Sequence, residues 1–459
     1  MLVPPLGLAY IAAVLEEADY SVRIIDAPAM GFTLPRVKDE LRRLHPDIVG
    51  VTATTSTFND ALSVSVAAKE ACPEAVVAIG GPHVSFLPEQ TLKQVPSIDI
   101  VGIGEGEQTF LDLVQALDAG KGLEGVRGLA YRDGGVVRKN PPRPLIDDLD
   151  KLPFPARHLL PMGKYLAFGR RIIAGGVLTS RGCPFNCIFC SSSLLFGKKF
   201  RSRSPENVVK EVEVLHNKYK ARDIEFFDDL FTLDRSRAMA ICREILDRDL
   251  EIRWVCSSRV DTIDRELLNT LKKAGCAMIY LGVESGSQHV LNLIRKGTRV
   301  EQSVKAIRLA REAGIATIAS FVFGIPGETL EEMKQTIRLA KSLNPDYAQF
   351  SIATPYPGTQ LYCMAKEQGL IVKDDWSEYT VLKPILATKE FTTNDLEKII
   401  LDAYKQFYIR PRYILKHIKE GHMNIVAHAL RFLLSSHKLR ALNFSQESRS
   451  SSAPLGHPT

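Results

Sequence analysis

The chain has 459 residues, of which 45% are hydrophobic and 24% are charged, and its formal net charge is +6. This length exceeds what one hydrophobic core usually organises, so we expect two or three globular domains. Eight scattered cysteines exclude a small disulfide-stabilised fold, and no run of about 18 apolar residues indicates a membrane-spanning helix. The start lacks the basic and apolar regions of a signal peptide, which predicts a cytoplasmic protein.

Positive charge is concentrated near the C-terminus. Residues 401–459 contain nine Lys and Arg against three Asp and Glu, so residues 1–400 are electrically balanced. Because this main body carries no dense basic stripe, we expect no nucleic-acid partner.

Residues 1–140 alternate between helical segments and short apolar runs. Strands are predicted at Ser21–Asp26 and within residues 46–53, 74–81 and 97–104, and a hairpin is predicted over 126–139 with its turn at Asp133-Gly134-Gly135. This alternation is typical of a parallel, doubly wound, Rossmann-like sheet, in which ligands bind beyond the strand ends. The chain opens directly in a helix, so the first strand of such a domain is expected to be missing or the start misassigned.

A proline-rich linker at 141–165 precedes a second alternating series over 166–374. Six strands separated by helices predict a partial (β/α)6 barrel of the TIM type, with helices at Pro205–Tyr219 and Leu330–Leu343 among them. We expect a helical region at 375–445 and a disordered tail at 446–459. The predicted barrel strands are Ile172–Leu178, Asp223–Phe227, Ile252–Cys256, Ala277–Gly282, Thr317–Phe323 and Tyr347–Ala353.

Three cysteines, Cys183, Cys187 and Cys190, follow the first predicted barrel strand. Structural zinc usually takes four ligands, and no second Cys/His pair occurs at a suitable spacing. A redox Cys-x-x-Cys pair would leave Cys183 without a role. Three thiolates in one short loop suit a [4Fe–4S] cluster with one iron open to another ligand. Polar or Gly-rich residues also follow the other five strands, at the face where barrel enzymes carry their sites.

The Cys-x3-Cys-x2-Cys loop, with Phe189 before its last cysteine, resembles the signature of radical S-adenosylmethionine (SAM) enzymes. The resemblance implies that the open iron binds the amino and carboxylate groups of SAM, and that an electron from the cluster cleaves SAM to methionine and a 5′-deoxyadenosyl radical. Phe189 would pack near the adenine, and the glycines after strand five would admit the adenosine. The implied cofactor-binding residues of the barrel are Phe189, Asp228, Asp229, Ser258, Arg259, Glu284, Gly324 and Gly327.

Together with the barrel, the first domain resembles the cobalamin-binding domain of cobalamin-dependent radical SAM enzymes, the group of radical methylases and the anaerobic magnesium-protoporphyrin ester cyclase. Such domains often carry Asp-x-His-x-x-Gly, but here Pro28 stands between Asp26 and Gly31 where the histidine would ligate cobalt. A G-x-G-x-x-G dinucleotide motif is incomplete at residues 102–107. The implied cobalamin-binding residues are Thr52, Thr54, Thr55, Gly80, Gly81, His83, Gly104 and Glu105.

The resemblance favours methylation of an unactivated carbon. One SAM would methylate cobalamin, a second would yield the radical that takes hydrogen from the substrate, and the substrate carbon would then accept the methyl group. Alternatives are radical cyclisation, oxidation or C–C coupling within the same superfamily, and a non-catalytic iron–sulfur or corrinoid-binding protein.

The partners that the resemblance implies are a small-molecule or lipid substrate and an external electron donor of flavodoxin or ferredoxin type. The apolar and basic segment 425–442 predicts either peripheral contact with an anionic membrane or a helix packed across the barrel mouth.

Overall fold

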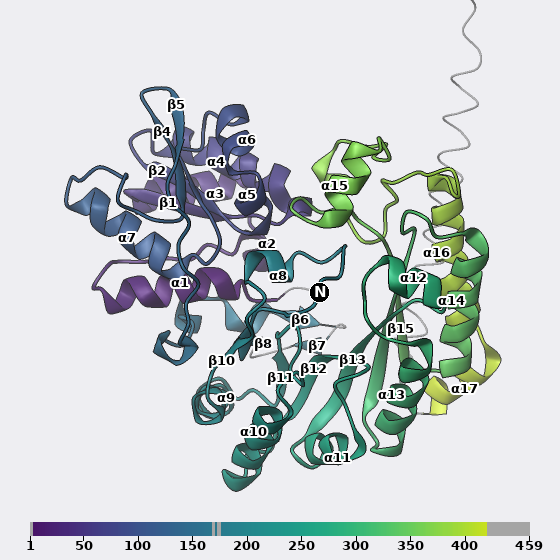
Figure 1. Ribbon diagram of the computed structural model, residues 1–459. Helices are drawn as coiled ribbons and strands as arrows, with labels where there is room; N and C mark the ends of the chain where they lie inside the picture. The colour runs from purple at the N-terminus through teal and green to yellow at the C-terminus, as the bar shows by residue number, and fades with distance from the viewer. Residues whose placement is uncertain (1–2, 168–169, 172–175, 420–459) are drawn as a thin grey trace, which may run out of the picture.

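The computed structural model describes residues 3–167, 170–171 and 176–419, and within them two main sheets flanked by helices (Figure 1). The N-terminal domain lies over one end of the barrel domain, and the segment around α15 reaches from the barrel toward it (Figure 1). The predicted helical region 375–445 is described only up to residue 419, and the tail 446–459 lies outside the described residues.

The N-terminal sheet has the order β1-β2-β3-β4-β5. Strands β1, β2 and β3 are parallel, and β4 and β5 add the predicted hairpin in antiparallel pairing. The elements of this domain are α1 (Leu6–Glu17), α2 (Ala27–Met30), α3 (Leu34–Leu44), β1 (Ile48–Thr52), η1 (Thr55–Thr57), α4 (Phe58–Ala71), β2 (Val76–Gly80), α5 (Pro82–Phe86), α6 (Pro88–Gln94), β3 (Ile100–Gly102), α7 (Glu107–Asp118), β4 (Leu129–Asp133) and β5 (Val136–Lys139).

Helices cover both faces of this sheet. Ile79 and Val101 pack in one apolar cluster with residues of α4, α5 and α6, whereas their neighbours Ala78 and Ile100 pack in another with residues of α7. Successive residues of a strand point to opposite faces, so both faces are buried. The predicted α/β class is confirmed.

The strand predicted at Ser21–Asp26 is wrong. These residues form no strand and pair with no strand of the described part of the chain. An apolar, β-branched run predicts a strand, but a strand also requires a hydrogen-bonded neighbour. Here Asp26 instead accepts a hydrogen bond from the backbone N–H of Ala29 and caps α2, and it accepts another from the hydroxyl of Tyr165 at 2.8 Å.

The barrel sheet has the order β15-β14-β13-β12-β11-β8, with parallel pairing throughout. Of the first predicted strand, residues 172–175 lie outside the described residues and β8 holds Gly176 and Val177. The other five predicted strands are confirmed, with each end within three residues of the prediction. The elements are β8 (Gly176–Val177), α9 (Pro205–Tyr219), β11 (Asp223–Phe226), α10 (Arg235–Asp247), β12 (Arg253–Arg259), α11 (Arg265–Lys273), β13 (Cys276–Glu284), α12 (Gln288–Leu293), α13 (Val300–Glu312), β14 (Ala316–Phe323), α14 (Leu330–Leu343) and β15 (Tyr347–Ile352).

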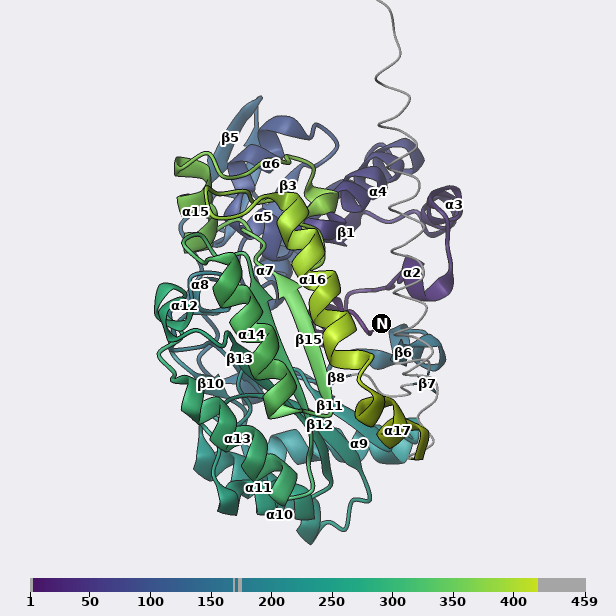
Figure 2. The same cartoon turned by 90° about the vertical axis from the view of Figure 1, so that its right-hand side faces the viewer.

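The open edge of the barrel at β15 is covered by α16, which runs along it (Figure 2). The hydroxyl of Tyr408 donates to the carbonyl of Ala348 at 2.8 Å and accepts from its N–H at 3.0 Å. The hydroxyl of Tyr404 makes the same pair of contacts with Phe350. Two tyrosines thus satisfy backbone groups that an edge strand would otherwise leave unpaired.

The remaining elements lie between the two domains, between β8 and α9 around the cysteine loop, or after β15. No described helix has the length and apolar character needed to cross a membrane. These elements are η2 (Leu149–Lys151), η3 (Arg157–Leu159), η4 (Met162–Lys164), β6 (Leu166–Ala167), β7 (Arg170–Arg171), β9 (Ser180–Arg181), α8 (Ser192–Leu195), β10 (Arg201–Ser202), α15 (Gln360–Glu367), η5 (Trp376–Glu378), α16 (Thr393–Tyr408) and α17 (Pro411–Lys419).

Candidate functional site

The cysteine loop is fixed at its start and in its middle by backbone contacts. Gly182 has a φ of +90°, and a Cβ there would lie 2.2 Å from the carbonyl oxygen of Lys199, so only glycine fits. The N–H of Cys183 donates to the carbonyl of Gly197 at 3.1 Å, and the N–H of Ile188 donates to the carbonyl of Ile294 at 3.1 Å. These contacts hold the three thiols on a defined backbone.

The three thiols are half-buried and unbridged. Burial raises the pKa of each, that of Cys190 to about 11, while the positive charges of Lys296 and Arg259 act in the opposite direction on Cys187. Within the described residues, no group of three such side chains converges on a single metal ion. A [4Fe–4S] cluster takes each thiolate on a different iron, so three spaced thiols suit the cluster, whose binding would release their protons.

Arg259, at the end of β12, lies against the cysteine loop. Its guanidinium carbon is 3.5 Å from the ring centroid of Phe185, within the loop. Two nitrogens donate to the carboxylate of Asp261 at 2.9 Å each, and one also donates to the carbonyl of Lys296 at 2.8 Å. The predicted contact of Arg259 with SAM would therefore compete with the stacking on Phe185 and the ion pair with Asp261 that this side chain already makes.

Glu284, at the end of β13, is paired with Lys296, which the sequence analysis missed. The two side chains are about nine-tenths buried, and the ammonium lies 2.6 Å from the carboxylate. A lysine followed by Gly297 after a short helix is common at a helix end, so no sequence signal distinguishes Lys296 as a site residue. This buried pair lies beside the cysteines and could meet the charged ends of SAM.

The two aspartates after β11 have different partners. The carboxylate of Asp228 accepts from the N–H groups of Thr179 and Ser180, at 2.6 and 3.1 Å, and from both hydroxyls. Both of its oxygens therefore hold the chain before the cysteine loop. Asp229 accepts from the hydroxyl of Ser192, and burial raises the pKa of Asp229. Of the pair, Asp229 is the one whose charge reaches Cys183 and Cys190.

The glycines after β14 form a turn held by Glu328. Gly324 and Gly327 have φ values of +84° and +91°. The N–H groups of Gly324 and Ile325 donate to one oxygen of Glu328, at 2.7 and 3.1 Å, and its other oxygen is buried without a hydrogen-bond partner. Burial raises the pKa of Glu328 to about 8. Gly324 is buried and Gly327 is exposed, so the turn offers its backbone to a ligand at Gly327.

Two further predicted site residues make contacts inside the barrel. The hydroxyl of Ser258 is buried and bonded to the hydroxyls of Thr232 and Thr262. Phe189 is half-buried and packs on the apolar cluster that contains Ile188. The predicted roles of these two residues as direct SAM contacts stay predictions.

In the N-terminal domain, the loops after β1 and β2 touch each other. Gly81 has a φ of +107°, and a Cβ there would lie 2.4 Å from the carbonyl oxygen of Ala53. Gly80 would accept a Cβ with no atom within 4 Å. Thr52 and Thr54 are exposed and Thr55 is buried. These loops offer hydroxyls and accessible backbone, which suits close passage of a large ligand.

The side chains of His83 and Glu105 are engaged by other protein groups, and their predicted roles in cobalamin binding stay predictions. His83 is buried between Phe58 and Trp376, with ring centroids 4.1 and 4.9 Å away, and burial lowers its pKa to about 4. Both oxygens of Glu105 contact arginines of the barrel domain. Gly104 keeps an open backbone with a φ of +80°.

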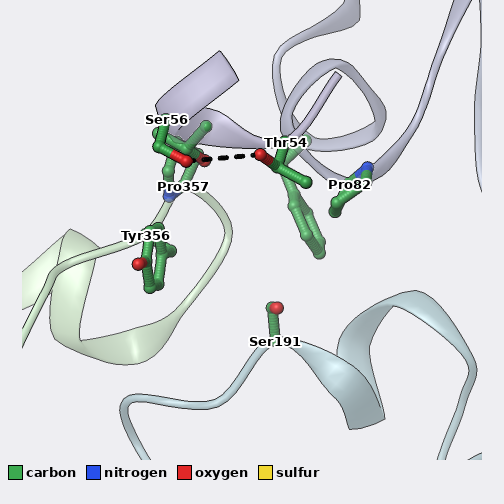
Figure 3. A pocket seen from close by; sticks show the side chains of 8 residues that line it. Thr54, Ser56, Pro82, Ser191, Tyr356 and Pro357 are labelled. Carbon is green, nitrogen blue, oxygen red and sulfur yellow. Dashed lines mark hydrogen bonds between the residues drawn. The ribbon is translucent and has the colours of Figure 1, made fainter. Parts of the chain in front are cut away.

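A cavity of about 330 Å³ lies between the two domains (Figure 3). Thr54 and Ser56, whose hydroxyl oxygens are 3.4 Å apart, face the cavity from the loop after β1. Ser191, the residue that follows Cys190, faces it from the barrel side (Figure 3). The cavity thus joins the predicted cobalamin loops to the cysteine loop. Its lining residues are Thr54, Thr55, Ser56, Pro82, Phe86, Ser191, Tyr356 and Pro357.

Known proteins match both domains in the predicted order. A model of the B12 binding domain matches residues 1–114, and a model of the radical SAM superfamily matches residues 177–340. An uncharacterized methyltransferase of Pyrococcus horikoshii is 46% identical over 94% of this chain and 93% of its own length. The anaerobic magnesium-protoporphyrin IX monomethyl ester cyclase of Rubrivivax gelatinosus is 35% identical over 90% of this chain and 75% of its own length.

A solved structure matches across both domains. The radical SAM methyltransferase TsrM from Kitasatospora setae, with cobalamin and a [4Fe–4S] cluster bound, has a TM-score of 0.70 and 20% identity and covers 89% of this chain and 87% of its own. That likeness concerns the fold, while the two family models confirm the predicted cofactors, a [4Fe–4S] cluster, SAM and cobalamin. At the identity and coverage of its relatives, the chain belongs to the radical SAM enzymes that carry a B12-binding domain, a family of methyltransferases and cyclases.

Proposed function

We propose that this enzyme transfers a methyl group to a carbon atom of an uncharged small molecule, or of an uncharged part of a larger one. The cavity between the domains carries the proposal, because loops of the B12-binding domain and the residue after Cys190 line the same space. A methyl carrier on one side and a radical source on the other would both reach a substrate there. The 46% identity to a methyltransferase supports the same conclusion.

The residues of this chain would divide the work of binding. Cys183, Cys187 and Cys190 would hold the cluster, and the Glu284–Lys296 pair would meet the charged groups of SAM. The threonines after β1 and Gly80 would hold cobalamin, with no protein ligand from Pro28. When bound, these cofactors supply hydrogen abstraction and methyl transfer.

The overall reaction balances with an external reductant. One C–H bond of the substrate and two SAM molecules would give the methylated product, S-adenosylhomocysteine, methionine and 5′-deoxyadenosine, and two electrons would enter. A donor of flavodoxin or ferredoxin type would supply these electrons.

The cavity lining supports a neutral reacting group. Hydroxyls of Thr54, Ser56 and Ser191 lie beside apolar surfaces such as Phe86. A volume of about 330 Å³ lies at the lower end of the range of about 300–1,000 Å³ common for ligand sites. Hydroxyls can orient one or two polar groups of a substrate without pairing a charge.

Labelled SAM tests the proposal. Anaerobically reconstituted enzyme, supplied with SAM carrying a deuterated methyl group and with metabolite extracts as substrate, is expected to give a product heavier by the labelled methyl, together with 5′-deoxyadenosine. Cys190→Ala should abolish both signals, whereas Cys363→Ala, at an exposed cysteine remote from the loop in sequence, should retain them. Absence of 5′-deoxyadenosine from iron-loaded wild-type protein would leave only the non-catalytic binding alternative.

Cyclisation is a second candidate, favoured by the 35% identity to a magnesium-protoporphyrin ester cyclase. The same experiment separates the two functions. A cyclase would form 5′-deoxyadenosine without moving the labelled methyl group into any product.

A lipid substrate is the alternative to a small metabolite. The predicted membrane-contact segment 425–442 lies outside the described residues. Flotation with vesicles containing anionic phospholipid, with and without residues 421–459, tests the contact. Co-flotation that disappears on truncation would favour a lipid substrate, and no flotation would favour a metabolite.

A further inference from the structure

Four buried charged side chains tie the B12-binding domain to the barrel. Glu105 and Glu107, at the start of α7, face Arg181 and Arg201, which flank the cysteine loop. Arg181 donates to Glu105 at 3.1 Å and to Glu107 at 2.5 Å. Arg201 contacts Glu105 at 2.9 and 3.1 Å. We call these four residues the interdomain clamp.

The clamp is closed to solvent and balanced in charge. Its side chains are between 1% and 6% exposed, and two carboxylates face two guanidiniums. Buried ions are costly to desolvate, and removal of one partner leaves the other uncompensated. The arginines are therefore held where the carboxylates of the other domain place them.

The clamp reaches the cysteine loop from both sides. Arg181 lies two residues before Cys183 in β9, which pairs with β10 through Arg201 itself. Arg201 also donates to the carbonyl of Phe196 at 2.8 Å. The next residue, Gly197, accepts the hydrogen bond of the Cys183 N–H. Both flanks of the loop thus depend on contacts with Glu105, directly through Arg181 or through Arg201.

We propose that Glu105 and Glu107 of the B12-binding domain are positioning residues for the cluster loop, acting through Arg181 and Arg201. The inference rests on the proposed function only in that Cys183, Cys187 and Cys190 hold the cluster. It assigns these carboxylates a role in the other domain, rather than in cobalamin contact. The position of the loop then depends on correct docking of the domain that carries the methyl group.

Glu105→Gln and Glu107→Gln test the clamp, because glutamine keeps the shape and removes the charge. Glu211→Gln is the matched control: Glu211 is also fully buried between two arginines, Arg157 at 2.6 Å and Arg203, but belongs to α9. In the full-length protein without cluster, hydrogen exchange of amides 180–190 is measured by mass spectrometry. In the iron-loaded protein, the rate of iron loss to a chelator and the EPR spectrum with SAM are measured.

We expect both clamp variants to accelerate exchange in residues 180–190 and to release iron at least about tenfold faster than wild type, with an altered EPR spectrum, because a single carboxylate then faces two buried guanidinium charges. Glu211→Gln should change iron release by less than about twofold while exchange rises around α9. Clamp variants that match wild type in both measurements would overturn the proposal, as would a control that releases iron equally fast. Wild-type protein that binds no iron would refute the proposed function, while the exchange measurement would still judge the clamp.

Discussion

The ends of the parallel strands carry different chemistry in the two sheets. At the barrel they bring together charged pairs beside the three cysteines, the buried Arg259 with the exposed Asp261 and the buried Glu284 with Lys296. At the N-terminal sheet they bring hydroxyls and the apolar Pro82 and Phe86 to the cavity, and the buried His83 beside them is neutral at pH 7 because burial lowers its pKa to about 4.

This difference matches the ligands of each sheet. SAM carries a sulfonium, an amino group and a carboxylate, and charged ligands are bound best by opposite charges in a desolvated site. Cobalamin presents a broad surface, which is held by shape, hydroxyls and close backbone approach. Fold alone would not distinguish the two sites, since both are strand-end loops of parallel sheets.

The largest expected effect concerns the barrel charges. Lys296→Met leaves the carboxylate of Glu284 buried and unpaired, so we expect the barrel to lose about 3–5 kcal/mol of unfolding free energy. Urea unfolding followed by the fluorescence of Trp254, which is fully buried in the barrel core, measures the loss.

The double variant Lys296→Met with Glu284→Gln is the control, because it removes both charges. It should recover most of the stability and still fail to bind SAM by equilibrium dialysis. If the single variant unfolds at the same urea concentration as wild type, the pair contributes no stability. Buried charge pairs would then not distinguish the barrel strand ends from those of the N-terminal sheet.

A smaller effect is expected at the two adjacent glycines of the N-terminal sheet. Gly81→Ala forces a side chain onto a φ of +107° and into the carbonyl of Ala53. Such strain costs about 1–3 kcal/mol, so the Kd for cobalamin, measured by the change in its absorption spectrum, should rise about 10- to 100-fold.

Gly80→Ala separates folding from ligand approach, because its Cβ would meet no protein atom within 4 Å. Thermal unfolding should be unchanged in this variant. A raised Kd for cobalamin would then locate the cofactor against Gly80, and an unchanged Kd would contradict the predicted close approach.

The sequence was sufficient where chemistry or periodicity is local. Cys183, Cys187 and Cys190 lie within eight residues, and this grouping, with its resemblance to the radical SAM signature, predicts a cluster that the matching family model supports. Short continuous apolar runs between helical segments predicted the barrel strands, because a strand buried on both faces needs apolar residues at successive positions. Pro205 and Ser204 marked the start of α9, where Ser204 accepts from the N–H of Asn207.

It was insufficient where a partner lies far along the chain. Glu105 was predicted to bind cobalamin, but its partners, Arg181 and Arg201, are 76 and 96 residues away. His83 is enclosed by Trp376, which follows the barrel. Whether a single charged residue is buried, and which residue it pairs with, depends on the tertiary structure. The local sequence around the residue does not reveal either property.

The smallest expected effect concerns Glu328, the buried carboxyl that holds the glycine turn at the barrel strand end. Burial raises its pKa to about 8 from a usual value near 4.5, so the folded protein retains a proton that the unfolded chain releases. The stability contributed by that proton is complete below pH 4.5 and is lost as the pH rises through 8, by at most about 1.4 kcal/mol per pH unit.

Glu328→Gln should therefore flatten the decline of barrel stability between pH 6 and pH 8, because glutamine accepts from the N–H groups of Gly324 and Ile325 without titrating. Trp254 fluorescence in urea at the two pH values gives the slope for each protein. Equal slopes in wild type and variant would mean that Glu328 is ionised when folded. The barrel turn would then hold a buried negative charge without a cation. The rule that buried charges at the barrel strand ends are paired would fail at this turn.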